Sequence, residues 1–284
     1  MSDGVLLLVK PPGCSSHNVA QAMRRRLGVP CGHLGTLDPL AAGLLVVAAG
    51  RATRLVRYAE GREKEYVAEI WLGIGTASED FAGPTSARSS AWHLGRPALA
   101  AALDAEALET AQRPPAFSAR QVGGERAYRA ARQGRALDLP SRPAQLLRWE
   151  ILALAGGETL RVRLRLLVSS GYYVRSLARD LGRRLGVPGV LAALLRTASG
   201  PFRLEDARTL EETPVLLPMD VLVGHLPTVE LDRDEGRRLG FGQRLPGAGE
   251  RQGLHAAYAA GRLVAVVDAH SGVFHPETVL AWED

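Results

Sequence analysis

Residues 32–43 decide how this chain is interpreted, and they read Gly32-His33-Leu34-Gly35-Thr36-Leu37-Asp38-Pro39-Leu40-Ala41-Ala42-Gly43. Glycines permit close approach of a backbone or a ligand, and Pro39 biases Asp38 toward an extended conformation. The stretch therefore places a carboxylate and an imidazole in a stiff loop flanked by glycines. Taken alone, the same pattern also fits an ordinary Asp-Pro turn beside a surface histidine, so the rest of the chain must decide.

Short apolar strands surround this loop. Apolar residues 5–9 predict a buried strand that stops at a Pro-Pro-Gly turn. A helix is predicted to begin at Ser15 or Ser16, which can cap it, and to end at Gly28. Apolar residues 44–47 predict a second strand.

Two further segments alternate with the period of a half-buried strand. In residues 65–72, Tyr66 begins a series of apolar residues at every second position. In residues 159–168, the apolar residues alternate with Arg161, Arg163 and Arg165, which gives one apolar face and one cationic face. That cationic face suits an RNA backbone and a solvated sheet surface equally well. Helices are predicted over residues 51–59, 97–109, 125–132 and 174–185.

The charge is distributed unevenly along the chain. The net charge is +5, and 33 of the 35 basic residues are arginine, whose planar fork suits phosphates and base edges. Residues 226–284 contain 6 basic and 9 acidic residues, whereas residues 1–225 contain 29 basic and 21 acidic residues. A polyanionic partner should therefore bind mainly to the first part. Residues 226–284 also contain short strands and glycine-rich turns, so we predict a separate, small β-rich domain there.

Several classes of protein receive no support. There is no phosphate-binding loop of the Gly-Lys-Ser/Thr type and no Gly-x-Ser-x-Gly elbow. Cys14-x-x-His17 and Cys31-x-His33 suggest zinc, but the second pair is tighter than the usual two-residue minimum, so no metal is expected. The first residues lack a basic signal-peptide region and the longest apolar stretch, 40–50, is too short for a membrane span. We expect a cytoplasmic protein with no membrane association.

Five motifs, in order, resemble those of TruB-type tRNA pseudouridine synthases. The loop of residues 32–43 is similar to the active-site segment of that family. The other four motifs are Lys10-Pro11-Pro12-Gly13-Cys14-Ser15-Ser16, Lys64-Glu65-Tyr66, Ser170-Gly171-Tyr172-Tyr173-Val174-Arg175-Ser176-Leu177 with Asp180-Leu181-Gly182, and Thr197-Ala198-Ser199-Gly200-Pro201-Phe202. Each motif is weak alone, but five in the family's order are specific.

The resemblance implies a role for each matching residue. Asp38 would be the catalytic nucleophile, and Arg175 would pair with its carboxylate. Tyr66 would stack on a flipped uracil, and its hydroxyl is a candidate for proton handling at C5. His33 would fill the gap left by the flipped nucleotide. The remaining matches to positions at or near the substrate are Lys10, Asp80 and Tyr173.

The resemblance also implies a fold and an activity. The expected fold is α+β, with a mixed, largely antiparallel central sheet flanked by helices over residues 1–225. Residues 226–284 would form a PUA-like RNA-binding domain. The expected activity is isomerisation of the T-arm uridine of tRNA, conventionally numbered 55, by a monomer that requires no cofactor and no protein partner. The alternatives are a guide-RNA-dependent enzyme of the dyskerin kind and an RNA-binding or tRNA-folding protein without catalysis.

Overall fold

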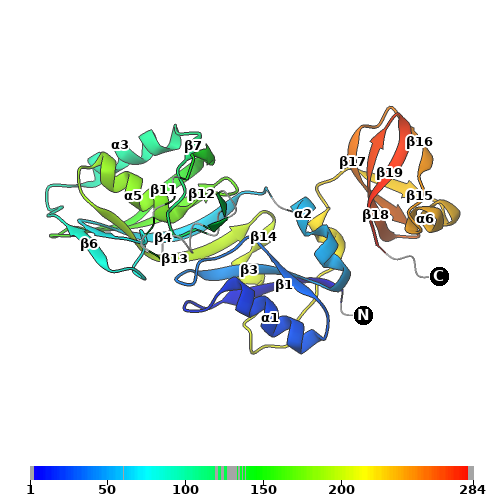
Figure 1. The fold of residues 1–284 in the computed structure, drawn as a ribbon, viewed down its shortest axis with the longest axis horizontal. Coiled ribbons are helices and arrows are strands. Elements are labelled where there is room, and N and C mark those ends of the chain that lie inside the picture. The colour runs from blue at the N-terminus through cyan, green and yellow to red at the C-terminus, as the bar shows by residue number, and fades with distance from the viewer. Residues whose placement is uncertain are drawn as a thin grey trace.

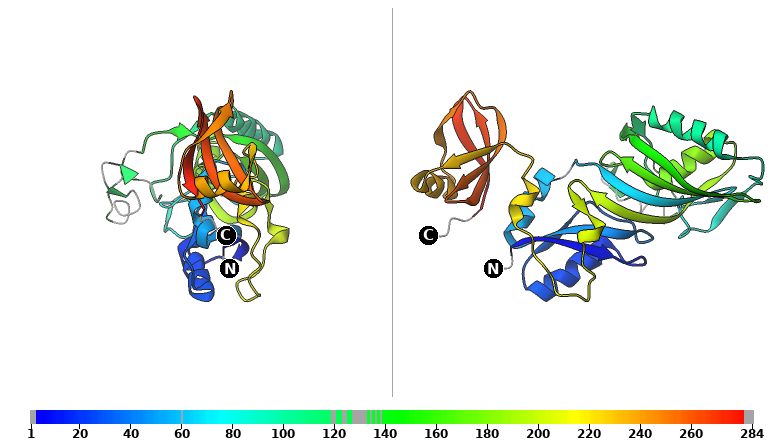
Figure 2. Two further views of the ribbon diagram at one scale, coloured as in Figure 1. Left: turned by 90° about the vertical axis from the view of Figure 1, so that its right-hand side faces the viewer. Right: turned by 180° about the vertical axis from the view of Figure 1, so that it is seen from behind.

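The computed structural model describes residues 3–59, 61–118, 121–122, 125–126, 133, 135, 137 and 139–280. The molecule is elongated, with helices α3 (Arg96–Ala107) and α5 (Val174–Arg184) near one end and a small β-rich unit at the other (Figure 1). The view from behind shows the same separation (Figure 2). No helix of the described residues is long and apolar enough to cross a membrane.

A central eight-stranded sheet forms the body of the protein. Its strand pairs are antiparallel, except that β13 runs parallel to β3. The predicted mixed, largely antiparallel sheet is therefore confirmed. The strand order is β1 (Gly4–Lys10), β3 (Ala42–Ala49), β13 (Gly189–Ser199), β4 (Lys64–Leu72), β12 (Leu160–Val168) and β11 (Leu146–Ala155), with β2 (Cys31–Leu34) beside β3 and β14 (Phe202–Arg203) beside β13.

Helix α1 (Ser16–Leu27) lies where the sequence predicts it. Ser15 caps its first turn by accepting a hydrogen bond from the Asn18 backbone N–H at 3.1 Å. Gly28 ends the helix in the left-handed conformation, with φ at 70°, which glycine adopts without a steric penalty. The buried side chains of Val19 and Met23 pack onto one face of strands β1 and β3.

Residues alternate along β4 and β12 between a buried face and a second face, which is half-buried in β4 and mostly exposed in β12. The inward residues of both strands pack with α3 and α5 in one apolar core. On the outer face, Arg161, Arg163 and Arg165 of β12 are exposed, and Arg165 pairs with Glu150 at 2.7 Å. The three side chains are thus accessible at the surface of the sheet.

The prediction of a helix over residues 125–132 is wrong where the structure describes that segment. Residues Glu125–Arg126 form strand β9, which pairs antiparallel with β8 (Gln121–Val122). The two glycines between these strands in the sequence are a signal for a tight hairpin, which outweighs the helical propensity of the residues that follow. The rest of the predicted helix, residues 127–132, lies outside the described residues.

A five-stranded sheet contains the last part of the chain. Its order is β15 (Thr228–Leu231), β17 (Gly253–Ala259), β18 (Arg262–His270), β19 (Gly272–Val279) and β16 (Leu245–Gly249), and helix α6 (Arg233–Gly240) packs against it. We call residues 228–280 the terminal β-unit. This unit matches the predicted β-rich architecture of the C-terminal region.

The terminal β-unit packs against the first part of the chain through 3₁₀-helix η1 (Gly50–Leu55) and helix α2 (Val56–Ala59). Tyr58 and Thr278 share a hydrogen bond of 2.7 Å between their hydroxyl groups, and Arg54 donates to the Val279 carbonyl at 2.9 Å. One apolar core includes Leu55 together with Leu263 of the unit. In place of the single helix predicted over residues 51–59, the structure has the 3₁₀-helix η1 followed by the single α-helical turn α2.

The remaining elements are short. They are hairpin β5 (Ile74–Thr76) and β6 (Thr85–Arg88), the pair β7 (Ala111–Gln112) and β10 (Arg142–Pro143), and the 3₁₀-helices η2 (Leu204–Asp206) and η3 (Met219–Leu222).

Candidate active site

The Asp38 loop connects β2 to β3, and hydrogen bonds fix it on both sides. The buried Ser16 hydroxyl donates to the Leu37 carbonyl at 3.0 Å and accepts from the Leu37 N–H at 2.8 Å. The Pro39 carbonyl accepts from the Gly13 N–H at 2.7 Å. The first turn of α1 and the Pro-Pro-Gly turn thus hold the residues on either side of Asp38, so the carboxylate has a defined position.

Lys10 reinforces the same loop from behind. Its side chain is fully buried, and its Nζ donates to the carbonyls of Pro11 at 2.9 Å, Cys14 at 2.7 Å and Pro39 at 3.5 Å. Burial lowers the pKa of Lys10, while the nearby Cys14 and Asp38 side chains oppose that change. Lys10 therefore contacts the loop that carries Asp38 and does not line the cleft itself.

Asp38 forms an ion pair with Arg175. The Nε of Arg175 donates to Oδ2 of Asp38 at 2.9 Å, and the Arg175 side chain is 5% exposed whereas that of Asp38 is 38% exposed. The carboxylate is therefore oriented by a buried cation and still open to a ligand. A buried guanidinium is tolerated when carboxylates and carbonyls surround it.

The loop before Phe81 supplies the other partners of Arg175. Its Nη1 donates to the Ser78 carbonyl at 3.3 Å, and its Nε lies 3.7 Å from Oδ2 of Asp80. Asp80 is buried, and its Oδ1 accepts from the Ser78 hydroxyl at 2.6 Å and from the Ala82 N–H at 3.0 Å. The guanidinium thus lies between an accessible carboxylate, Asp38, and a buried one, Asp80.

Tyr66 lies on β4 beside a buried arginine that the sequence does not single out. Tyr66 is opposite Arg196 in the register of β4 and β13, and Arg196 is fully buried. Burial raises the pKa of Tyr66, and the adjacent Arg196 guanidinium partly opposes this. Arg196 also donates to the Leu44 carbonyl at 2.7 Å and the Gly35 carbonyl at 3.1 Å, so it links the tyrosine to both ends of the Asp38 loop.

Gly43 allows this close approach of β3 to β13. Its φ is 105°, and a Cβ at this position would lie 2.4 Å from the Arg196 carbonyl oxygen. No other residue type fits without moving the backbone that carries Arg196.

These residues surround a cleft of about 400 Å³. Asp38, Tyr66, Tyr173 and Arg175 all contribute to its lining, so the structure brings together four of the seven residues that the sequence singles out. Asp80 and Lys10 lie behind the cleft wall. The other lining residues are Gly35, Thr36, Leu37, Lys64, Ser118, Ser170, Gly171, Tyr172, Val174 and Leu194.

His33 lies on β2 and is not part of the cleft lining. Its Nδ1 is buried and makes no hydrogen bond with the described residues. Burial lowers the pKa of His33, and the charges of Arg196 and His17 lower it further. The imidazole is therefore neutral at neutral pH.

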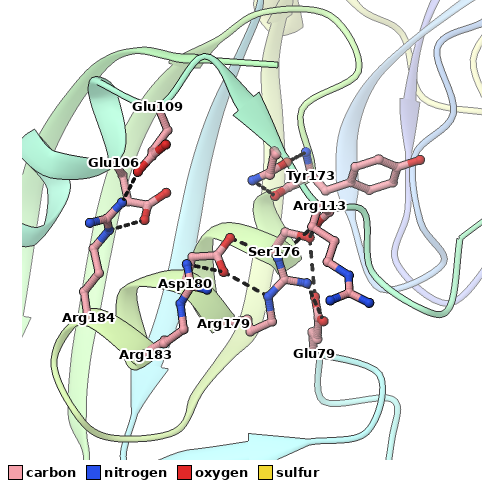
Figure 3. A network of polar contacts seen from close by, with 11 residues as sticks. Glu79, Glu106, Glu109, Arg113, Tyr173, Ser176, Arg179, Asp180, Arg183 and Arg184 are labelled. Carbon is pink, nitrogen blue, oxygen red and sulfur yellow. Dashed lines mark hydrogen bonds and ion pairs between the residues drawn. The ribbon is translucent and has the colours of Figure 1, made fainter. Parts of the chain in front are cut away.

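A network of ion pairs lies along α5 and joins it to neighbouring segments (Figure 3). Arg179 binds Glu79 at 2.9 Å and both carboxylate oxygens of Asp180 at 3.0 Å. Arg184 pairs with Glu106 and with Glu109. Glu79 belongs to the loop that holds Arg175, so Arg179 connects α5 to that loop, whereas Arg184 connects the end of α5 to Glu106 of α3. The described residues contain no group of three His, Cys, Asp or Glu side chains that could hold a metal ion.

Comparison with known sequences identifies the family. Residues 24–174 match the N-terminal domain of the TruB family of pseudouridylate synthases. A protein of Arthrobacter sp. named tRNA pseudouridine synthase B is 39% identical over 99% of this chain and 97% of its own length. A protein of the same name from Thermobifida fusca is 38% identical over 99% of both chains.

Solved structures show a similar fold. One describes an H/ACA ribonucleoprotein bound to a substrate RNA containing 2′-deoxyuridine, and its matching chain has a TM-score of 0.74 and 26% identity over 99% of this chain and 86% of that one. A Cbf5-Nop10-Gar1 complex gives a TM-score of 0.71 and 28% identity over 99% of this chain and 84% of that one. The pseudouridine synthase fold predicted from the sequence is confirmed. With its fold, its motifs and its near full-length relatives in agreement, this chain belongs to the TruB family of pseudouridylate synthases, which are isomerases.

Proposed function

We propose that this protein converts the T-arm uridine of tRNA, position 55, to pseudouridine, with Asp38 as the nucleophile. The observation that carries the proposal is the Asp38 carboxylate, which is accessible, paired with the buried Arg175 at 2.9 Å and located in a cleft whose lining includes Tyr66. The relatives named tRNA pseudouridine synthase B support tRNA as the substrate.

The reaction exchanges one bond to the ribose for another. Asp38 would attack either C6 of the base or C1′ of the ribose, and the N1–C1′ bond breaks. The uracil then turns and rejoins through a C5–C1′ bond. C5 loses its proton and N1 gains one, so atoms and charge balance without an oxidant, a reductant or a group donor. Asp38 is released unchanged.

The substrate base must leave its stack to reach the cleft. Extracting a nucleotide costs a few kcal/mol. In this proposal the aromatic ring of Tyr66 stacks on the uracil, which returns about 1–3 kcal/mol. The raised pKa of Tyr66 keeps its hydroxyl protonated in the free protein, which favours stacking over a role as a ready tyrosinate base. His33, outside the cleft, would occupy the space that the flipped nucleotide leaves.

We further assign catalysis to residues 1–225 and RNA binding by a PUA-like domain to residues 226–284. The separate five-stranded sheet of the terminal β-unit supports this division. The contrast between net charges of +8 and −3 suggests that most phosphate contacts lie in the first part.

The test is to incubate the purified protein alone with unmodified tRNA transcript and to map pseudouridine at single-nucleotide resolution. We expect one modified position, in the T-arm, with no added guide RNA, metal or second protein. Tight tRNA binding without any pseudouridine would favour an RNA-binding or tRNA-folding protein. Activity only with a guide RNA would favour the dyskerin-like alternative.

A further inference from the structure

Ser118 has a buried hydroxyl group at the cleft that forms no hydrogen bond. The residue is 3% exposed and contributes to the same lining as Asp38 and Tyr66. Its Oγ has no hydrogen-bond partner among the described residues. A buried hydroxyl without a partner destabilises the folded protein, so such a group calls for an explanation.

Gln112 and Arg113, which precede Ser118 in the chain, form hydrogen bonds with helix α5 and with Tyr173, the residue before it (Figure 3). The Arg113 carbonyl accepts hydrogen bonds from the Ser176 hydroxyl and from Nη2 of Arg179, each at 3.0 Å. The Gln112 side chain binds the backbone of Tyr173 twice, as it accepts from the N–H at 2.8 Å and donates to the carbonyl at 3.1 Å. These contacts tie the chain just before Ser118 to the helix turn that carries Arg175.

A second buried hydroxyl nearby has a different environment. The hydroxyl of Tyr172 also has no hydrogen-bond partner among the described residues. Burial raises the pKa of Tyr172, and the negative charges of Glu106 and Asp180 raise it further. These two carboxylates line a neighbouring cavity and not the catalytic cleft. Tyr172 itself lines both spaces, whereas Ser118 lines only the cleft, which makes Ser118 the better candidate for a contact with substrate.

The chemistry of the cleft indicates what Ser118 can bind. Asp38 and Arg175 are paired with each other, and Leu37, Val174 and Leu194 are apolar. Thr36, Lys64 and Ser170 are also polar, but Ser118 is the serine of this lining whose hydroxyl is buried without a hydrogen-bond partner among the described residues. A uracil in this cleft brings two carbonyl oxygens and an N3–H that need polar partners. A serine hydroxyl can donate one hydrogen bond and accept others, so it matches that edge.

We propose that the Ser118 hydroxyl donates a hydrogen bond to a carbonyl oxygen of the flipped uracil and thereby holds the base in position over Asp38. This inference rests on the proposed function. It makes Ser118 a substrate contact, and Gln112 and Arg179 positioning residues for the segment that carries it.

The test is a double-mutant cycle between the protein and the RNA. Wild type, Ser118→Ala and Ser118→Thr are assayed on T-arm stem-loops that carry uridine, 2-thiouridine or 4-thiouridine at the target, because sulfur is a weak hydrogen-bond acceptor. On uridine, Ser118→Ala should lower kcat/KM by about three- to tenfold, and Ser118→Thr, which keeps the hydroxyl, should recover most of it. One thio substitution should slow wild type and have little further effect on Ser118→Ala.

Ser141→Ala provides the matched control, because Ser141 is exposed and does not line the cleft. Thermal unfolding of all variants separates a loss of contact from a loss of fold. The inference is overturned if Ser118→Ala matches wild type on uridine, or if both thio penalties are the same in wild type and Ser118→Ala. A wild-type protein that leaves the uridine stem-loop unmodified would instead refute the proposed function.

Discussion

Asp38 combines two properties that a nucleophile needs, a fixed position and an open face. The pair with Arg175 fixes one oxygen at 2.9 Å, and the side chain remains 38% exposed. Asp38→Asn keeps the shape and can still accept the hydrogen bond from Arg175, but an amide cannot act as the nucleophile. We predict that Asp38→Asn forms no detectable pseudouridine and binds tRNA with nearly wild-type affinity, as measured by base mapping and by fluorescence anisotropy. Appreciable turnover would remove Asp38 from its assigned role.

Gly43 gives a prediction about stability at the same scale. Gly43→Ala combines a positive φ with a Cβ that would lie 2.4 Å from a backbone carbonyl. Gly28→Ala is the matched control, because Gly28 has φ of 70° and nothing within 4 Å of the added Cβ. The control should cost about 1 kcal/mol for its conformation, and Gly43→Ala should cost clearly more, on the order of 3 kcal/mol. Urea unfolding measures both, and equal losses would contradict the account of the β3 and β13 contact.

The structural role of Arg196 could not be predicted from the sequence. Its position in a strand of otherwise apolar and small residues hints at an unusual environment. Its importance, however, depends on the carbonyls of Gly35 and Leu44, which lie more than 150 residues earlier in the chain. Asp38, Tyr66 and Arg175 could be selected because they belong to motifs with local order. Arg196 could not, because long-range packing brings its partners to it.

At the scale of elements, the alternation of apolar and polar residues predicts a strand only when one face of that strand is uniformly buried. Residues 65–72 and 159–168 satisfy that condition, and both are strands of the central sheet. Strand β11 does not, because its register against β12 shifts twice, which interrupts the alternation of buried and exposed residues. The position of β13 between β3 and β4 depends on a parallel pairing between distant segments, which no local pattern encodes.

Glu79, in the loop that holds Arg175, should make the stability of the protein depend on pH. Burial raises the pKa of Glu79 above its usual value, although Arg179 opposes the shift. Folding therefore disfavours the ionised carboxylate. Between the ordinary pKa of a glutamate and the raised pKa of Glu79, the folded state binds more protons than the unfolded state. The free energy of unfolding of wild type should therefore fall, relative to that of Glu79→Gln, as the pH rises through this window.

Chemical unfolding of wild type and Glu79→Gln over a pH series measures this difference directly. Below the ordinary pKa of a glutamate, Glu79 is protonated in both states, and the difference between the two proteins should be constant. A difference that does not change with pH would contradict the assignment. So would a gain of wild-type stability over the variant at higher pH.

At the scale of the whole molecule, the uneven distribution of charge predicts which region determines the salt dependence of tRNA binding. Helix α6 contains Arg233, Arg237 and Arg238 within a region whose net charge is −3. One phosphate contact contributes about 0.7–0.9 to the slope of log K against log salt. We predict that replacing all three arginines by glutamine changes this slope for tRNA binding by less than that amount. Anisotropy titrations of tRNA over a salt series test this. A loss of most of the slope would place the main phosphate contacts in the terminal β-unit.

The apolar core that includes both Leu55 and Leu263 has a consequence for synthesis of the chain. Val5, Leu44 and Leu55 leave the ribosome more than 200 residues ahead of Ala256, Val266 and Leu280, which share their core. Part of the apolar surface of the β1 and β3 side therefore stays uncovered until residues 256–280 have been made. The apolar residues of the core that contains Tyr66 and Leu177 extend no further along the chain than Leu194. This second core can thus assemble first, and the surface that awaits the terminal β-unit is where a nascent chain is most exposed to aggregation.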